Sequence, residues 1–270
     1  MTRIEAELGK WLQTVQISWS QRMAYKLSFV LLVIGPTLVF FFVKYSLWTS
    51  VYAARGVDRI AGYDLSTMLT YQVWVMVVAF LGQGYNGINV SEDIRLGRIS
   101  SYLVYPFDFW KFHAASFLSL QILQLLVSAV TVAAMALFGV IRLPPLATLA
   151  AGTAMSLLVS LFWFVVIYTI GVAGFWLEET WVLRVMLMTV SSFLSGAVLP
   201  LELFPAALRR LLAFTPFPCV TFVPTKVFMG SYDGSLAAAA GLLLCWIAIG
   251  AVLAAAIWRR GLRLYTAAGM

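Results

Sequence analysis

The stretch LPPLATLAAGTAMSLLVSLFWFVVIYTIGVAGFWL (143–177) contains no charged side chain. It is long enough to cross a lipid bilayer as a helix, which takes about 20 apolar residues. Similar runs occur elsewhere in the chain, at 27–43, 65–91, 114–141, 185–201 and 236–258. We therefore predict an all-α integral membrane protein with six transmembrane helices. The helix within 143–177 is expected to be long or tilted and to begin after Pro144-Pro145.

The composition agrees with a membrane protein. The 270-residue chain is 62% hydrophobic and 11% charged, whereas a soluble domain carries roughly a quarter charged residues. We attribute the net charge of +7 to the bias of basic residues towards the cytoplasmic side, and not to binding of nucleic acid. The cluster Trp258-Arg259-Arg260 resembles the anchor that closes a span on that side. We therefore expect a multi-pass protein with both termini in the cytoplasm.

The spans divide the chain into three parts. Residues 1–26 form an N-terminal tail that carries apolar side chains at helical spacing: Ile4, Leu8, Trp11, Leu12 and Val15. This pattern predicts a helix lying in the membrane interface, and a short solvated tail is the alternative. Residues 27–258 form the transmembrane domain, and residues 259–270 form a cytoplasmic C-terminal tail.

Polar side chains in the second predicted span are candidates for lining a transport pathway. Gln72, Gln83 and Asn86 fall on one side of that helix at 100° per residue, and Gln121 and Gln124 lie in the third span. Hydrogen bonding between helices is the alternative for all of them. No charged side chain lies near the middle of any span, which argues against a proton- or ion-coupled carrier.

The segment 200–235 before the last span is apolar yet interrupted by prolines, so it fits neither a solvated loop nor a single span. We predict two short helices that dip into the outer leaflet, the first with Pro205 in its first turn. These helices would plug a translocation route, through residues that include Pro200, Phe204, Pro205 and Pro216. Helices lying flat on the membrane surface are the alternative.

The sequence carries no motif for catalysis. It lacks a G-x-x-x-x-G-K-[ST] phosphate loop, a G-x-S-x-G motif and an H-E-x-x-H motif. The two cysteines, Cys219 and Cys245, fall in different segments, and the single histidine, His113, is expected to be a boundary residue. We therefore predict no enzyme, no metal site and no bound cofactor, and any energy for transport must come from another subunit.

The segment 91–112 is a short charged interruption between the second and third spans. Residues 92–105 have the pattern of an amphipathic helix that Pro106 ends. One face holds apolar side chains: Leu96, Ile99, Tyr102 and Leu103. The other face holds small or polar residues: Asp93, Gly97, Ser100 and Ser101. Such a helix either docks on a soluble partner or rests on lipid headgroups.

Four stretches resemble the ABC-2 type permeases, the membrane subunits of many bacterial ABC exporters. They are MAYKLSF (23–29), DIRLGRISSYLVYP (93–106), SGAVLPLELFPAALRRLLAFTPF (195–217) and GLRLYTAAG (261–269). They occur in the expected order along the chain. The second is closest to the branch with a D-I-R-x-G cytoplasmic loop.

The resemblance implies a permease with an N-terminal elbow helix and a cytoplasmic coupling helix, in a bacterial inner membrane. It implies a separate ATPase subunit that binds ATP and Mg²⁺, and a second permease, identical or paralogous. Closure of the ATPase subunits on binding ATP would pull on residues 92–105 and thereby shift spans two and five. The residues expected to couple to the ATPase are Asp93, Ile94, Arg95, Gly97, Arg98 and Ile99. The substrate would be hydrophobic or amphipathic, and a motor-independent carrier or channel is the alternative function.

Overall fold

The computed structural model describes residues 3–23, 26–82, 89–104 and 107–265. Within these residues the chain is helical, and its β structure is limited to an isolated bridge between Ile60 and Tyr63. The first half of the chain forms α1 (Arg3–Met23), α2 (Lys26–Arg55), α3 (Leu65–Gly82), α4 (Val90–Arg95), α5 (Ile99–Val104) and α6 (Phe109–Leu137). The second half forms α7 (Leu146–Val172), η2 (Ala173–Phe175), α8 (Trp181–Leu194), η3 (Leu201–Leu203), α9 (Ala206–Leu212), α10 (Phe217–Val220), α11 (Phe222–Phe228) and α12 (Leu236–Leu264).

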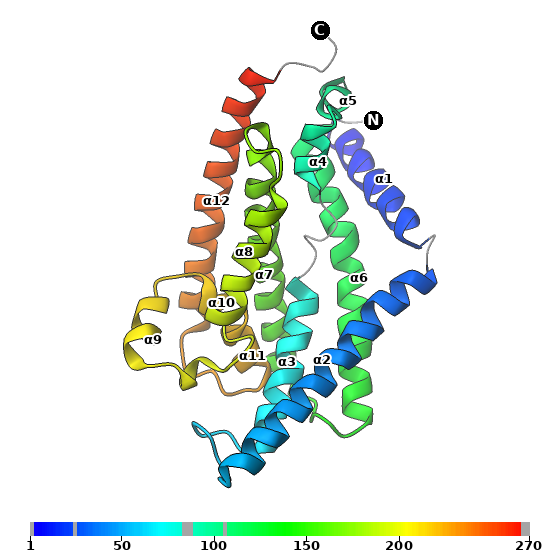
Figure 1. Ribbon diagram of the computed structural model, residues 1–270. Coiled ribbons are helices and arrows are strands. Elements are labelled where there is room, and N and C mark those ends of the chain that lie inside the picture. Colours follow the sequence, from blue (N-terminus) through cyan, green and yellow to red (C-terminus); the bar gives the residue numbers. More distant parts are fainter. Residues whose placement is uncertain (1–2, 24–25, 83–88, 105–106, 266–270) are drawn as a thin grey trace.

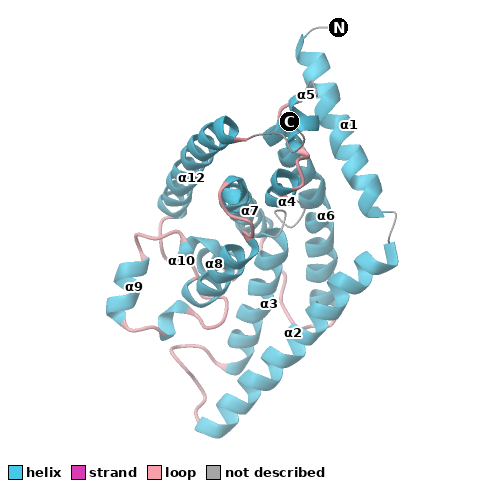
Figure 2. Cartoon of the chain, turned by 45° about the horizontal axis from the view of Figure 1, so that its top comes forward, coloured by secondary structure: helices cyan, strands magenta, loops and turns pink. Residues whose placement is uncertain are grey.

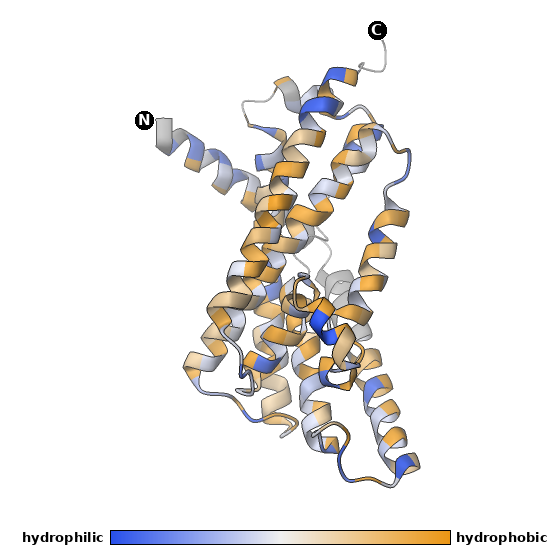
Figure 3. Ribbon diagram, turned by 90° about the vertical axis from the view of Figure 1, so that its left-hand side faces the viewer, coloured by the Kyte–Doolittle hydropathy of each residue, from blue (hydrophilic) through white to orange (hydrophobic). Residues whose placement is uncertain are grey.

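Four helical segments of the described chain are long and apolar enough to cross a membrane: α3, α6, α7 with η2, and α12. Each corresponds to a span predicted from the sequence. Figure 3 shows apolar residues along the sides of the long helices and hydrophilic residues gathered towards the two ends of the bundle. This distribution is that of a protein whose sides face lipid and whose ends face water.

The other two predicted spans differ from these four. The first, 27–43, lies within the 30-residue helix α2, and most of its side chains lie outside the described residues. The fifth, 185–201, is interrupted, because α8 has 14 residues and ends at Leu194. A helix of that length rises about 21 Å, less than the roughly 30 Å of a hydrocarbon core. The six-span topology therefore remains a prediction.

Helix α7 is the centre of the bundle. It packs against α12, α11, α3 and α4, and Figures 1 and 2 show these elements around it. Glycines allow the closest approaches. A Cβ at Gly152 would lie 2.6 Å from the ring of Phe228, and one at Gly171 would lie 2.6 Å from Cβ of Val90. Small residues at such crossings let helices pack tightly in a membrane.

Helix α1 lies along the first half of α6 (Figure 1). The Ser18 and Ser116 hydroxyl oxygens are 3.3 Å apart, and the Trp11 ring lies edge-on to Phe107 at 5.6 Å between centroids. The opposite side of α1 leaves Leu8 more than half exposed. A helix with one docked face and one exposed apolar face is compatible with the predicted elbow, whose place in the membrane interface stays a prediction.

The segment between α8 and α12 contains more helices than predicted. The structure has η3, α9, α10 and α11, where the sequence suggested two short helices. Pro205 is the residue before α9, with ψ of 144°, and is not within its first turn. The prolines stand at the starts of these helices: Pro205 directly precedes α9, Pro216 directly precedes α10, and Pro224 lies in the first turn of α11. A proline is tolerated there because the first turn of a helix needs no N–H donor, and the sequence pattern did not resolve how many helices begin. The end of the bundle with these helices is called the α9 end below, and the opposite end is called the α4 end.

Candidate functional site

The charged segment between α3 and α6 forms a helix–turn–helix and not the single helix predicted for 92–105. Helix α4 ends at Arg95, and α5 begins at Ile99. Between them Gly97 adopts φ of +71°, and its N–H donates to the Ile94 carbonyl at 3.1 Å. A glycine in the left-handed region commonly ends a helix in this way. Hydrophobic periodicity does not detect such a break, which is why the prediction was wrong.

The break also changes which side chains face inwards. Ile94 and Ile99 are 5% and 0% exposed, and they pack in a cluster with Phe109 of α6 and Val172 of α7. Leu96, predicted to share the apolar face with Ile99, is instead 54% exposed. The prediction that Leu96 and Ile99 share one apolar face is therefore wrong, because the turn at Gly97 separates them.

Asp93 connects the two short helices to α6. Its carboxylate accepts hydrogen bonds from the Arg98 guanidinium at 3.0 Å and the Tyr102 hydroxyl at 3.4 Å. His113 Nε2 of α6 lies 3.4 Å from the same carboxylate. Burial raises the pKa of Asp93, although the bonds from Arg98 and Tyr102 act in the opposite direction. Asp93 is thus an internal brace and is 7% exposed.

Arg95, Leu96 and Arg98 form the exposed surface of the turn. The Arg95 guanidinium lies 2.5 Å from a carboxylate oxygen of Glu179, in the loop between η2 and α8, and both side chains are more than half exposed. A polar hollow of about 250 Å³ lies beside this ion pair. Of the six residues predicted to couple to an ATPase, the structure places Arg95 and Arg98 at the surface and Asp93, Ile94 and Ile99 in the interior.

Gly97, the sixth, is bound by the end of α12. The Tyr265 hydroxyl donates to the Gly97 carbonyl at 3.1 Å and lies 3.3 Å from the Ser100 hydroxyl. The resemblance described above includes Tyr265 in the C-terminal stretch GLRLYTAAG (261–269). That resemblance did not indicate that Tyr265 contacts residues near position 97. Neither Tyr265 nor Glu179 was predicted as part of the site, because each lies far away in sequence.

The polar side chains predicted in the second and third spans differ in their surroundings. Gln121 donates to the Leu81 carbonyl at 2.8 Å and accepts a bond from Ser160, so it joins α6 to α3 and α7. Gln72 is 7% exposed, and its Nε2 has no hydrogen-bond partner among the described residues. Gln83 and Asn86 lie outside the described residues. A pathway role for Gln72, Gln83 and Asn86 remains a prediction.

The predicted plug residues lie at the α9 end. Pro200 and Pro216 are buried, Phe204 is partly buried, and Pro205 is exposed. Whether they obstruct a route remains a prediction.

Beside the predicted plug is a network that the sequence did not indicate. The Tyr63 hydroxyl donates to Glu202 at 3.1 Å, and the Lys226 ammonium lies 3.3 Å from the same carboxylate and donates to the Tyr63 hydroxyl at 3.2 Å. We call these three residues the outer triad. It ties the α2–α3 loop to η3 and α11.

Comparison with known protein families gives one assignment. The family model described as ABC-2 family transporter protein matches residues 21–269. The match extends from the end of α1 to the residues after α12 and includes the α4–α5 turn and the outer triad. No curated protein matches the chain.

Proposed function

Because the chain belongs to the ABC-2 transporter family, and is therefore a multi-pass membrane transport protein, we propose that it is the permease subunit of an ATP-driven ABC exporter. A separate subunit would bind ATP and Mg²⁺ and supply the energy. The substrate would be hydrophobic or amphipathic and would cross a bacterial inner membrane. The family match supports the transport role, and the ATP-driven export is our extension of it.

In this proposal the α4 end faces the cytoplasm. Basic residues gather there, since the α4–α5 turn carries Arg95 and Arg98 and the end of α12 carries Arg259, Arg260 and Arg263. An excess of arginine and lysine beside the spans is typical of the cytoplasmic side. Both termini would then lie in the cytoplasm.

The observation that carries the proposal is an exposed apolar side chain on a braced turn. Leu96 is 54% exposed at the α4 end, and in the sequence it lies between the exposed residues Arg95 and Arg98. An apolar anchor flanked by charges is the usual composition of a docking surface, where the anchor fills a pocket and the charges fix orientation. We propose that the ATPase subunit binds this surface.

The contacts of α4 and of Asp93 indicate which helices would move if the ATPase displaced the α4–α5 turn. Helix α4 packs on α7 and η2, where Gly174 and Ser91 come close together, and Asp93 joins the turn to α6. Movement of the turn would therefore displace α7 and α6 directly. The family resemblance suggested displacement of spans two and five, which correspond to α3 and α8, so the packing favours a different first step.

We also propose a second permease, identical or paralogous, against α8. Among the described residues of α8 only Ser191 is buried. Its exposed apolar side chains are Trp181, Val182, Leu183, Val185, Met186, Val190 and Phe193. The apolar side chains of α8 must be buried against either protein or lipid. A helix of the second permease would bury them and would also shield the ends of α8, which is too short to span the hydrocarbon core alone.

The proposal is tested by expressing this chain together with its genomic neighbours, purifying it in a mild detergent and measuring how much of a co-purified ATPase subunit is retained. Leu96→Asp should reduce the retained ATPase at least about tenfold, as loss of a buried interface anchor does. Leu211→Asp is the matched control, because Leu211 is a 67% exposed leucine at the α9 end. Equal retention by Leu96→Asp and the wild type would reject the docking surface.

The Arg95 contribution needs a charge exchange, because Arg95 already pairs with Glu179. Arg95→Glu should lower ATPase retention, and the double variant Arg95→Glu/Glu179→Arg restores the pair with its charges reversed. If Arg95 contacts the ATPase, retention stays low in the double variant. If retention returns to the wild-type level, Arg95 acts only within this chain.

A further inference from the structure

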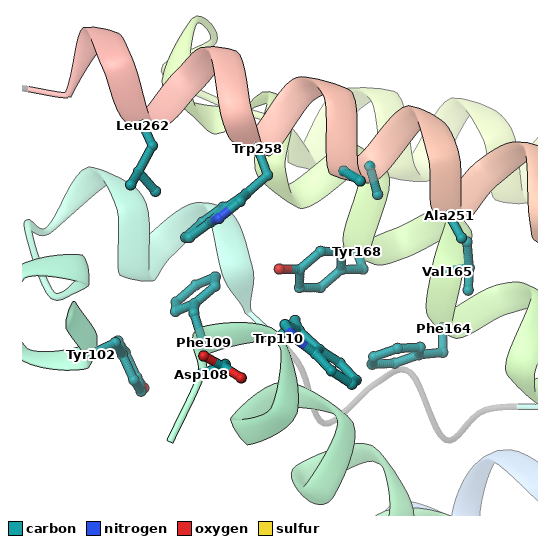
Figure 4. A pocket seen from close by; sticks show the side chains of 12 residues that line it. Tyr102, Asp108, Phe109, Trp110, Phe164, Val165, Tyr168, Ala251, Trp258 and Leu262 are labelled. Carbon is teal, nitrogen blue, oxygen red and sulfur yellow. The ribbon is translucent and has the colours of Figure 1, made fainter. Parts of the chain in front are cut away.

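A half-enclosed cavity of about 650 Å³ lies at the α4 end between the first turn of α6, the second half of α7 and the last turns of α12 (Figure 4). Pockets that hold drug-sized molecules generally measure about 300–1,000 Å³. The exposed residues of the proposed docking surface, Arg95, Leu96 and Arg98, do not line this cavity, although Tyr102 of the adjoining α5 does. The outer triad lies at the other end of the bundle. The cavity is therefore a separate feature of the fold.

Aromatic rings form most of the wall. They come from four elements and are Tyr102, Phe109, Trp110, Phe164, Tyr168 and Trp258. The rings of Phe109 and Trp258 are stacked, with centroids 4.8 Å apart and planes at 11°. In Figure 4 the Tyr168 hydroxyl points into the space between Trp258 and Trp110. The faces of aromatic rings carry negative potential and attract organic cations.

The rest of the wall separates into a polar end and an apolar end. Asp108 lies beside Phe109 at the start of α6, and α12 contributes the small side chains of Ala251, Ala254 and Ala255 further along. These three alanines lie within little more than one turn of α12, and their small side chains leave room for an apolar body. The cavity is therefore suited to an amphipathic molecule with its polar part near Asp108.

The charge of the lining residues determines whether the polar group of the ligand is a cation or an anion. Asp108 is the one acidic side chain among the lining residues, and they include no lysine, arginine or histidine. Its side chain is 60% exposed and pairs with Lys111 at 2.7 Å, while the Lys111 ammonium is also 3.3 Å from Glu7. An anion would meet a carboxylate and the faces of aromatic rings, whereas a cation would be attracted by both.

We propose that this cavity binds a lipophilic organic cation. The positive centre would lie among Phe109, Trp110 and Trp258 and close to the Asp108 carboxylate, and the apolar body would rest on the alanines of α12. The proposal is independent of the proposed transport function, because binding requires neither an ATPase nor a second permease.

The test is equilibrium binding of tetraphenylphosphonium to the full chain purified in a neutral detergent, with binding to empty micelles subtracted. Tetraphenylborate, an anion of the same shape, is the second probe. Asp108→Asn should weaken binding of the cation between about threefold and thirtyfold, the range that corresponds to a single charge–quadrupole or partly exposed ionic contact. It should leave binding of the anion equal or stronger.

Two further variants distinguish the contribution of the aromatic rings to binding from that of the cavity volume. Trp258→Leu keeps an apolar side chain but removes a ring, so it should weaken the cation several-fold and leave the anion unchanged. Ala255→Trp should abolish binding by filling the cavity. Its control is Ala256→Trp, at an exposed alanine that does not line the cavity, and both should show wild-type unfolding temperatures.

Three results would overturn the proposal: saturable binding that Ala255→Trp leaves intact, equal loss of both probes in Asp108→Asn, or no binding of the cation above the micelle background. The ratio of variant to wild type is compared for each probe, so the different partitioning of the two ions into detergent cancels. The Leu96→Asp variant, which addresses the ATPase, should bind the cation as the wild type does. Failure of one proposal is therefore distinguishable from failure of the other.

Discussion

At the scale of single residues, Asp93 is a carboxylate whose surroundings act against its charge. Burial raises its pKa above the ordinary value of 3.8, so the folded chain holds the proton more tightly than the unfolded chain does. A group of this kind stabilises the fold below its unfolded pKa, and that contribution is lost as the pH rises through the folded pKa. Ionisation of Asp93 therefore costs more free energy in the folded chain than in the unfolded chain.

We expect the difference in unfolding temperature between the wild type and Asp93→Asn to shift in favour of the wild type as the pH falls from 7 towards 4. Asp64→Asn is the control of opposite sign. Bonds from Thr67 lower the pKa of Asp64 below its ordinary value of 3.8, so wild-type stability relative to that variant should hold down to about pH 4 and decline only below it, and the pH series therefore extends below 4. Thermal unfolding in detergent at a series of pH values measures both, and parallel curves for the two variants would contradict the assignment.

At the scale of elements, the outer triad fixes the broken helices of the α9 end to the α2–α3 loop. The Lys226 side chain is 15% exposed and Glu202 is 29% exposed, so loss of one partner leaves the other in a partly dry environment. Lys226→Met should lower the free energy of unfolding by about 1–3 kcal/mol. Adding Glu202→Gln should cost little more, because the carboxylate that lacked its cation is gone.

A double-mutant cycle on Lys226 and Glu202 measures that coupling. The matched control pairs Lys226→Met with Asp233→Asn, an exposed carboxylate at the same end of the bundle. If the effects of Lys226→Met and Glu202→Gln simply add, the triad does not act as a unit. The segment would then be held by its apolar contacts alone.

At the scale of the whole molecule, the number of spans depends on whether the chain crosses the bilayer between α7 and α12. Helix α8 is too short to cross alone, and η3, α9, α10 and α11 follow it. We expect Glu178 and Asp233 to lie on opposite sides of the membrane. In a variant without Cys219 and Cys245, Asp233→Cys should react with an impermeant thiol reagent in intact cells. Glu178→Cys should react only after permeabilisation.

Asp58→Cys and Arg263→Cys provide the reference for each side, the first expected outside and the second inside. Labelling of Glu178→Cys and Asp233→Cys from the same side would show that 178–233 does not cross. The six predicted spans would then be reduced to five, and the two termini would lie on opposite sides of the membrane.

The sequence predicted the long helices well because their signal is local. A charge-free run such as 143–177 requires a helix in a bilayer, whatever packs against it. The α4–α5 turn was mispredicted because a single left-handed residue, Gly97, redirects the chain without altering composition. The buried roles of Asp93 and Ile99 follow from that turn.

Contacts between distant residues were outside the reach of sequence patterns. Tyr63, Glu202 and Lys226 are each unremarkable where they stand in the sequence, and their pairing depends on how three segments meet at the α9 end. The aromatic cavity has the same origin, because its rings come from segments far apart in the chain. Periodicity identifies which face of a helix is apolar, but it does not identify which helix that face meets.

The bond from Tyr265 to the Gly97 carbonyl also has a consequence for synthesis. The ribosome makes Tyr265 168 residues after Gly97, so the α4–α5 turn lacks this hydrogen bond while those residues are being synthesised. The bond closes only when α12 has been made and has packed beside α7. A nascent or truncated chain therefore presents an unfinished turn, and an ATPase subunit that docks there would assemble preferentially with completed chains.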